Sequence, residues 1–90
     1  MRIEFTAHGW ADFCHWLDAD PAMADRIRDL IADIKRDPFE RLVKPEPLRH
    51  QLAGFWSRRI NGEHRLVYAL SGTRPDKRLT VLSCRFHFDQ

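Results

Sequence analysis

The second half of the chain contains three strand-like stretches, and the first two flank the pair Asn61-Gly62. The stretches cover residues 55–60, 64–70 and 78–86, with a turn at 71–77 before the last one. Asn-Gly between two such stretches is a strong signal for a tight hairpin. The sequence therefore predicts an antiparallel meander, and the rest of the chain must pack on this sheet.

The first half predicts one strand and two helices. Residues 2–6 alternate polar and apolar side chains, as in a half-buried strand. Apolar residues then recur at helical spacing in two stretches, and Asp20-Pro21 between them is a helix-start signal. The apolar residues are Trp10, Phe13, Cys14 and Leu17 in the first stretch, and Met23, Ile27, Leu30, Ile31 and Ile34 in the second. Pro38 is expected to end the second helix, because the residue before a proline disfavours helix.

These elements predict a single α+β domain over residues 1–90, in the order β-α-α-β-β-β. Two helices are expected to cover one face of an antiparallel-dominated sheet. Residues 38–53 contain three prolines, Pro38, Pro45 and Pro47, and read as one long loop. Loops of this length in a compact domain are often functional.

Strand parity divides residues 64–70 between the two faces of the sheet. The two sets are Leu66, Tyr68 and Leu70 on one face, and Arg65, Val67 and Ala69 on the other. The bulkier apolar set is expected to face the helices, which leaves Arg65 on the open face. A two-residue turn would place Arg58 beside Arg65, whereas a bulge or an odd-length loop would place Arg59 there, and the sequence leaves both registers open.

Charge is distributed unevenly along the chain. Residues 1–40 contain five Lys/Arg and nine Asp/Glu (−4), and residues 41–90 contain ten and four (+6), which sum to the net charge of +2. Twelve of the fifteen basic residues are arginine, which binds phosphate bidentately and stacks on bases. From composition alone, nucleic-acid binding and an ordinary charged surface are equally favoured interpretations of the basic half. The row Asp25, Asp29, Asp33 and Asp37 is interpreted as a solvated helix face, with contact to a basic partner as the alternative.

Other classes of protein are disfavoured. No stretch approaches the ~20 apolar residues of a membrane helix, and the first residues lack a signal-peptide pattern, so we expect a cytoplasmic protein without membrane association. The two cysteines, Cys14 and Cys84, are expected to be free thiols in a reducing compartment. Cysteines and histidines show no metal-ligand spacing and no glycine-rich phosphate loop occurs, so we expect neither metal nor cofactor.

The basic half contains the groups needed to cleave RNA without a metal. A base must take the proton of the 2′-hydroxyl, an acid must protonate the leaving oxygen, and a cation must stabilise the phosphate. Glu46, between two prolines, is the candidate base, His87 the candidate acid and Arg65 the candidate cation. Taken singly, the ordinary interpretations are a solvated glutamate, a packed histidine, and an ion pair of Arg65 with Glu63 or Asp76.

Further residues could hold phosphates or bases. The candidates are Arg49, Arg58, Arg59 and Arg85 for phosphates, and Trp56 and Phe88 for stacking. Trp56 is equally compatible with the core. His64 is expected to orient or pair within the hairpin.

Several sequence blocks resemble the YoeB (Txe/YoeB) toxins of the RelE/ParE superfamily. The blocks are Asp37–Glu40, Lys44–Leu48, Gly54–Ile60, Glu63–Tyr68 and Cys84–His87. The resemblance implies a microbial-ribonuclease-like fold and a ribosome-dependent mRNA endonuclease, the toxin of a type II toxin–antitoxin pair. Residue by residue, it implies that Glu46 is the general base, Arg65 the phosphate-stabilising arginine and His87 the general acid.

The resemblance also implies a substrate contact, and the sequence departs from the family pattern at two positions. Arg59 would contact a substrate phosphate, and Arg49 stands where the family often has lysine. Phe88 replaces the family's usual tyrosine after the catalytic histidine, which keeps a ring for stacking but removes a hydroxyl. Activity could therefore be reduced or the base preference altered.

The implied partners are the ribosome, mRNA and a partly disordered antitoxin of the YefM/Phd kind, with a homodimer as a further option. Two rival functions remain open. The first is a non-enzymatic inhibitor of the ParE kind that acts on DNA gyrase, and the pair Glu46 and His87 argues against it. The second is an antitoxin-binding module that has lost catalysis, and Phe88 is the feature that favours it.

Overall fold

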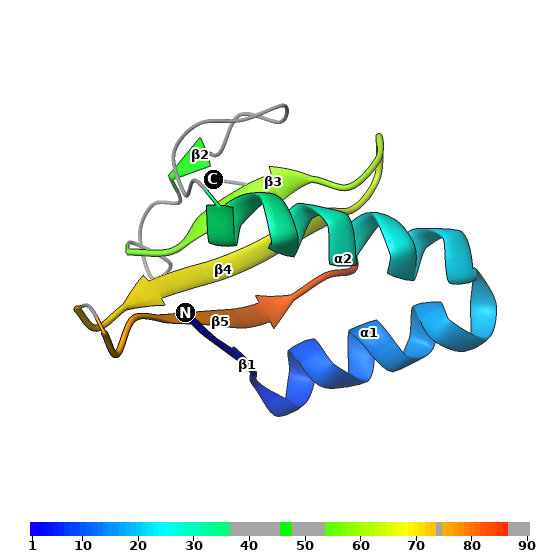
Figure 1. Cartoon of the computed structure of the whole chain (residues 1–90). Helices are drawn as coiled ribbons and strands as arrows, with labels where there is room; N and C mark the ends of the chain where they lie inside the picture. The colour runs from blue at the N-terminus through cyan, green and yellow to red at the C-terminus, as the bar shows by residue number, and fades with distance from the viewer. Residues whose placement is uncertain (37–45, 48–53, 74, 87–90) are drawn as a thin grey trace.

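The computed structural model describes residues 1–36, 46–47, 54–73 and 75–86. Within these residues two helices pack on a five-stranded sheet of order β1-β5-β4-β3-β2 (Figure 1). The strands are β1 (Arg2–Phe5), β2 (Glu46–Pro47), β3 (Trp56–Arg59), β4 (Arg65–Ser71) and β5 (Arg78–Ser83), and the helices are α1 (Ala7–Ala19) and α2 (Pro21–Arg36). The predicted α+β class and the order of the predicted elements are confirmed.

The sheet is mixed and has one strand more than predicted. β1 pairs in parallel with β5, while β5, β4, β3 and β2 pair antiparallel in turn. β2 falls in the stretch 38–53 that was predicted to be entirely loop. Its two residues, Glu46 and Pro47, lie at the edge of the sheet, where a proline without an N–H is tolerated. The rest of that stretch lies outside the described residues.

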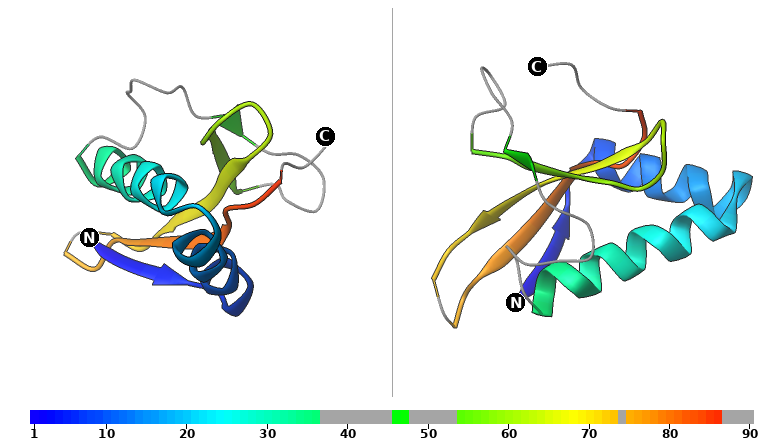
Figure 2. Two further views of the ribbon diagram at one scale, coloured as in Figure 1. Left: turned by 90° about the vertical axis from the view of Figure 1, so that its right-hand side faces the viewer. Right: turned by 90° about the horizontal axis from the view of Figure 1, so that it is seen from above.

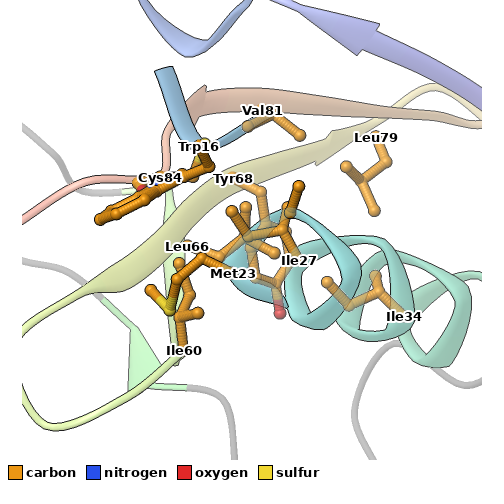
Figure 3. Close-up of a cluster of buried hydrophobic side chains, with 11 residues drawn as sticks. Trp16, Met23, Ile27, Ile34, Ile60, Leu66, Tyr68, Leu79, Val81 and Cys84 are labelled. Atoms are coloured by element: carbon orange, nitrogen blue, oxygen red, sulfur yellow. The ribbon is translucent and has the colours of Figure 1, made fainter. Parts of the chain in front are cut away.

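The core lies between α2 and the middle of the sheet (Figure 3). The predicted stripe of the second helix is confirmed, since Met23, Ile27 and Ile34 are buried and Leu30 and Ile31 pack against the same cluster. The sheet contributes the set that includes Leu66, Tyr68, Leu79 and Val81, each 0% exposed. Figure 2 shows α1 and α2 running next to one another along the sheet. Neither helix is long and apolar enough to cross a membrane.

The predicted apolar stripe of α1 is wrong at both ends, because Trp10 and Leu17 are 53% and 48% exposed. The buried residues of this helix are Gly9, Asp12 and Trp16. A side chain at Gly9 would collide with the backbone carbonyl of Val81, so the helix approaches β5 more closely on this face than any other residue would allow. This close approach fixes the rotation of α1 about its axis.

The loop between β3 and β4 is longer than the Asn-Gly signal predicts. The strands pair in the odd-length register, with Arg59 opposite Arg65. Asn61 explains the difference, because its Oδ1 accepts the N–H groups of Glu63 and His64 at 2.8 and 2.9 Å. An Asn side chain bound in this way closes the chain reversal by itself, without a two-residue turn.

This register turns Arg58 toward α2, where its side chain is 0% exposed. Its guanidinium donates to Asp33 Oδ2 at 2.5 Å and to Tyr68 Oη at 3.2 Å. Asp33 also accepts from Arg36 at 2.7 Å and is only 12% exposed, so the interpretation of the aspartate row as a solvated face is wrong at Asp33. It holds at Asp25, whose side chain is 66% exposed.

We expect Asp33→Asn to lower the free energy of unfolding by about 3 kcal/mol, because it removes the negative partner of a buried guanidinium. Asp25→Asn is the matched control, since it breaks an exposed pair with Arg28 on the same helix. It should cost less than about 1 kcal/mol. Urea unfolding followed by tryptophan fluorescence measures both values, and equal losses would contradict the structural role of Asp33.

Candidate active site

The face of β3 and β4 that points away from α2 combines two arginines with two small or apolar residues. Arg59 lies opposite Arg65, and Ser57 lies opposite Val67. The backbone of Glu46 in β2 lies opposite Ser57. Directly opposed residues share a face of a sheet, so these four residues and position 46 form one patch, which we call the site face.

Both the side chain and the backbone of Arg65 donate hydrogen bonds that hold the residue in place on the site face. Its Nε donates to Ser57 Oγ at 3.0 Å, across the diagonal between the strands. Its backbone N–H donates to the carbonyl of Phe86 at 2.9 Å. Arg65 is half-buried, and Ser57 is 2% exposed. A guanidinium fixed in this way can act as a pre-aimed cationic donor.

The pairing of Arg59 with Arg65 favours an anionic ligand. Arg59 is exposed, which leaves this side of the pair accessible to solvent. Arginine binds phosphate oxygens bidentately, so two arginines on one face suit the neighbouring phosphates of a nucleic-acid strand. The chemistry of the site face therefore fits a phosphodiester better than a neutral ligand.

The chain beyond β5 runs against α1 and then alongside the start of β4. At Cys84 the backbone N–H donates to Asp12 Oδ2 at 3.0 Å, and the carbonyl accepts from Trp16 Nε1 at 2.8 Å. Two residues later, the N–H of Phe86 donates to His64 Nδ1 at 2.7 Å. The backbone carbonyl of His64 pairs within the hairpin as expected, where it accepts from Ile60 and Asn61, while the side chain of His64 bonds to Phe86 outside it. We call residues 84–86 the strap.

The other predicted site residues are divided as follows. Arg58 supports the fold rather than the site, and Trp56 is half-buried against the core. The guanidinium of Arg85 lies over two rings, 5.9 Å from the ring centroid of Trp16 and 4.8 Å from that of Phe86. Arg49, His87 and Phe88 lie outside the described residues, and Glu46 is described only through its backbone. In the part of the chain that is described, no His, Cys, Asp and Glu side chains cluster as a metal site would require.

Sequence reasoning missed the contributions of Ser57 and of the strap. The signal for Ser57 was available, since it lies two residues before Arg59 and so shares its face. The strap had no such signal, because its hydrogen bonds join residues 21 (86 − 65) to 75 positions apart.

Comparison with known proteins extends the resemblance over the whole chain. A family model for the YoeB-like toxin of bacterial type II toxin-antitoxin systems matches residues 5–88. The toxin YoeB of Streptomyces coelicolor is 50% identical over 88 residues, which are 98% of this chain and 100% of that protein.

Solved structures agree with the sequence match. The YoeB/ParE toxin from Agrobacterium tumefaciens has a TM-score of 0.91 at 48% identity, covering 98% of this chain and 100% of that one. YoeB from Staphylococcus aureus, at 35% identity and 98% coverage of both chains, has TM-scores of 0.86 as a dimer and 0.84 in a heterotetrameric YoeB-YefM complex.

The buried position of Cys84 in the strap leads to a prediction about the reactivity of its thiol. Burial raises the pKa of Cys84 to about 12, and the nearby carboxylate of Asp12 adds to this effect. We therefore expect Cys84 to resist alkylation by iodoacetamide at pH 8 in the folded protein, because the thiolate is the reactive form. Cys14 is free and only half-buried, and should react. Peptide mapping by mass spectrometry distinguishes the two, and equal labelling without denaturant would contradict the buried position of Cys84.

Proposed function

Because the chain belongs to the family of YoeB-like toxins of bacterial type II toxin–antitoxin systems, we propose that it is a ribosome-dependent endoribonuclease that cleaves mRNA. The observation that carries the proposal is the site face. It combines a fixed guanidinium at Arg65, a second one at Arg59, and the backbone of Glu46 one strand away. This arrangement supports a metal-free RNA cleavage in which Arg65 is the cation and Glu46 the base.

In the proposed reaction, Glu46 takes the proton of the 2′-hydroxyl, and the resulting oxygen attacks the adjacent phosphorus. Arg65 stabilises the negative charge that grows on the phosphoryl oxygens. The bond from phosphorus to the 5′-oxygen breaks, and His87 protonates that oxygen. The products are an RNA with a 2′,3′-cyclic phosphate and an RNA with a 5′-hydroxyl.

Three further residues are assigned to the substrate. Arg59 contacts a phosphate next to the one that is cleaved, because it lies opposite Arg65 on the site face. Arg49 contributes a second phosphate contact, and Phe88 stacks on a base. Arg58 takes no part in substrate binding, since its guanidinium is buried against Asp33.

The size of the protein supports the proposed dependence on the ribosome. A domain of 90 residues offers little surface with which to bend an mRNA for in-line attack. Docking on the ribosome would supply this positioning, which is a large catalytic contribution.

The remaining partners are proposed from the family. We propose that the protein is cytoplasmic. We also propose that its partner is a YefM/Phd-like antitoxin, whose partly disordered chain orders on the toxin. The heterotetrameric YoeB-YefM complex from Staphylococcus aureus supports this partner, and the dimer of the same protein supports a homodimer.

We expect Glu46→Ala, Arg65→Ala and His87→Ala each to slow the cleavage of ribosome-bound mRNA by about 10²- to 10⁴-fold. Arg78→Ala is the matched control. It removes an exposed arginine from the first residue of β5, at the opposite end of the β4–β5 pair from Arg65. Its rate should equal that of the wild type. Primer extension measures the rates and locates the cut.

The rival functions predict different results in the same assay. Equal cleavage by the wild type and a Glu46→Ala, His87→Ala double variant would remove the proposed acid and base. DNA damage on expression without loss of mRNA would instead favour a gyrase inhibitor. Unimpaired growth on expression without antitoxin would favour a module that only binds the antitoxin.

A further inference from the structure

We propose that His64 is a positioning residue for the general acid, because it holds the last described peptide before His87. This inference rests on the proposed function, in which His87 protonates the leaving oxygen. His64 touches neither substrate nor reacting atoms in this scheme. It acts through the backbone of Phe86, which is covalently joined to His87.

Two consecutive residues of β4 and its preceding loop hold both polar groups of the Phe86 backbone. His64 Nδ1 accepts the N–H of Phe86 at 2.7 Å. The N–H of Arg65 donates to the carbonyl of Phe86 at 2.9 Å. The residue that supplies the candidate cation therefore also holds the carbonyl of the peptide bond that leads to the candidate acid. One bond on each side of Phe86 fixes the position of its backbone.

The backbone of Phe86 has a strained conformation, which the two hydrogen bonds to its N–H and carbonyl would maintain. Its φ is +61°, in the left-handed region that residues with a Cβ seldom adopt, and it is the sole residue other than glycine with a positive φ in the described part of the chain. A strained conformation persists only where surrounding contacts determine it, and such residues cluster at functional sites. The strain lies at the residue immediately before the candidate acid in the sequence.

The ring of His64 is itself oriented by α1. It packs edge-on against Trp16, with ring centroids 4.8 Å apart, and lies 5.6 Å from the ring of Phe86. Trp16 is fixed in turn by its hydrogen bond to the carbonyl of Cys84. To accept the amide, Nδ1 must be unprotonated, so the neutral imidazole with its hydrogen on Nε2 is the required form.

The contribution of this bond to stability should be small. The bond is exposed to solvent, and the side chain of Phe86 is 62% exposed. Water could therefore satisfy the amide if His64 were replaced, and a solvent-exchanged hydrogen bond contributes little net free energy. What water cannot replace is the fixed position of the Phe86 backbone, to which His87 is joined. A positioning role thus predicts a loss of rate without a comparable loss of stability.

Two substitutions separate the ring of His64 from its acceptor. His64→Phe keeps a ring against Trp16 and removes the acceptor. His64→Asn removes the ring and places a carbonyl oxygen where Nδ1 was. His15→Phe is the matched control, because His15 also packs edge-on against Trp16 at 4.8 Å but makes no described contact with Phe86.

We expect His64→Phe to lower the saturating rate of mRNA cleavage by about 10- to 100-fold, the scale of a misplaced catalytic group. The mRNA-programmed ribosome concentration at half-saturation should not change. His64→Asn should recover most of the rate, and His15→Phe should match the wild type. Thermal melting of each variant shows whether it is folded at the assay temperature.

A wild-type rate in His64→Phe would overturn the inference. So would a His64→Phe variant in which only the ribosome concentration at half-saturation changes, or a His64→Asn variant no faster than His64→Phe. Should either variant fail to fold, the wild type provides the test. A nitrogen–nitrogen NMR coupling across the bond from the Phe86 amide to His64 Nδ1 is expected, and its absence overturns the inference. A wild type that cleaves no mRNA would instead overturn the ribonuclease proposal, and this inference with it.

Discussion

The buried ion pair between Arg58 and Asp33 determines which residues of β3 reach the site face. Successive residues of a strand point to opposite faces, so a shift of one position in the pairing of β3 with β4 would exchange the roles of Arg58 and Arg59. A guanidinium cannot be buried against the core without a negative partner, and α2 supplies that partner through Asp33. The register that satisfies Arg58 is the register that places Arg59 opposite Arg65.

The same interaction explains part of the charge asymmetry between the two halves of the sequence. One aspartate of the acidic half is used inside the protein, where it neutralises an arginine of the basic half. Arg58 therefore adds little to the positive potential felt by an approaching anion. Among the described residues, the positive potential of the site face comes instead from Arg59 and Arg65, which lie opposite one another in neighbouring strands.

The sequence predicted α2 and the order of the predicted elements, because both depend on local periodicity. It left open the choice between Arg58 and Arg59, because this register depends on Asn61, whose side chain closes the loop in place of a two-residue turn. The rotation of α1 was predicted wrongly, since it depends on the contact of Gly9 with the backbone of β5. β2 was missed because two residues carry no periodic signal.

Less of the candidate site than of the fold could be predicted from local sequence patterns. Strand parity alone placed Arg65 on the face away from the helices, and the structure adds Ser57 as its hydrogen-bond partner. The roles of Glu46 and His87 came from the resemblance to a family and remain predictions, as do those of Arg49 and Phe88. No local pattern indicates that Asp12 and Trp16 hold the backbone of Cys84, because helix and strap are distant in sequence and meet only in the folded chain.

The β3–β4 loop links these observations. Asn61 sets its length, His64 follows within it, and Arg65 begins the next strand. An inserted residue in this loop would therefore displace two things together: the guanidinium on the site face and the two bonds that hold Phe86. Separate loops for these tasks would let the cation and the C-terminal segment move independently. Placing both on consecutive residues ties the cation and the C-terminal segment to the same short stretch of backbone, which the planar peptide bond between His64 and Arg65 stiffens.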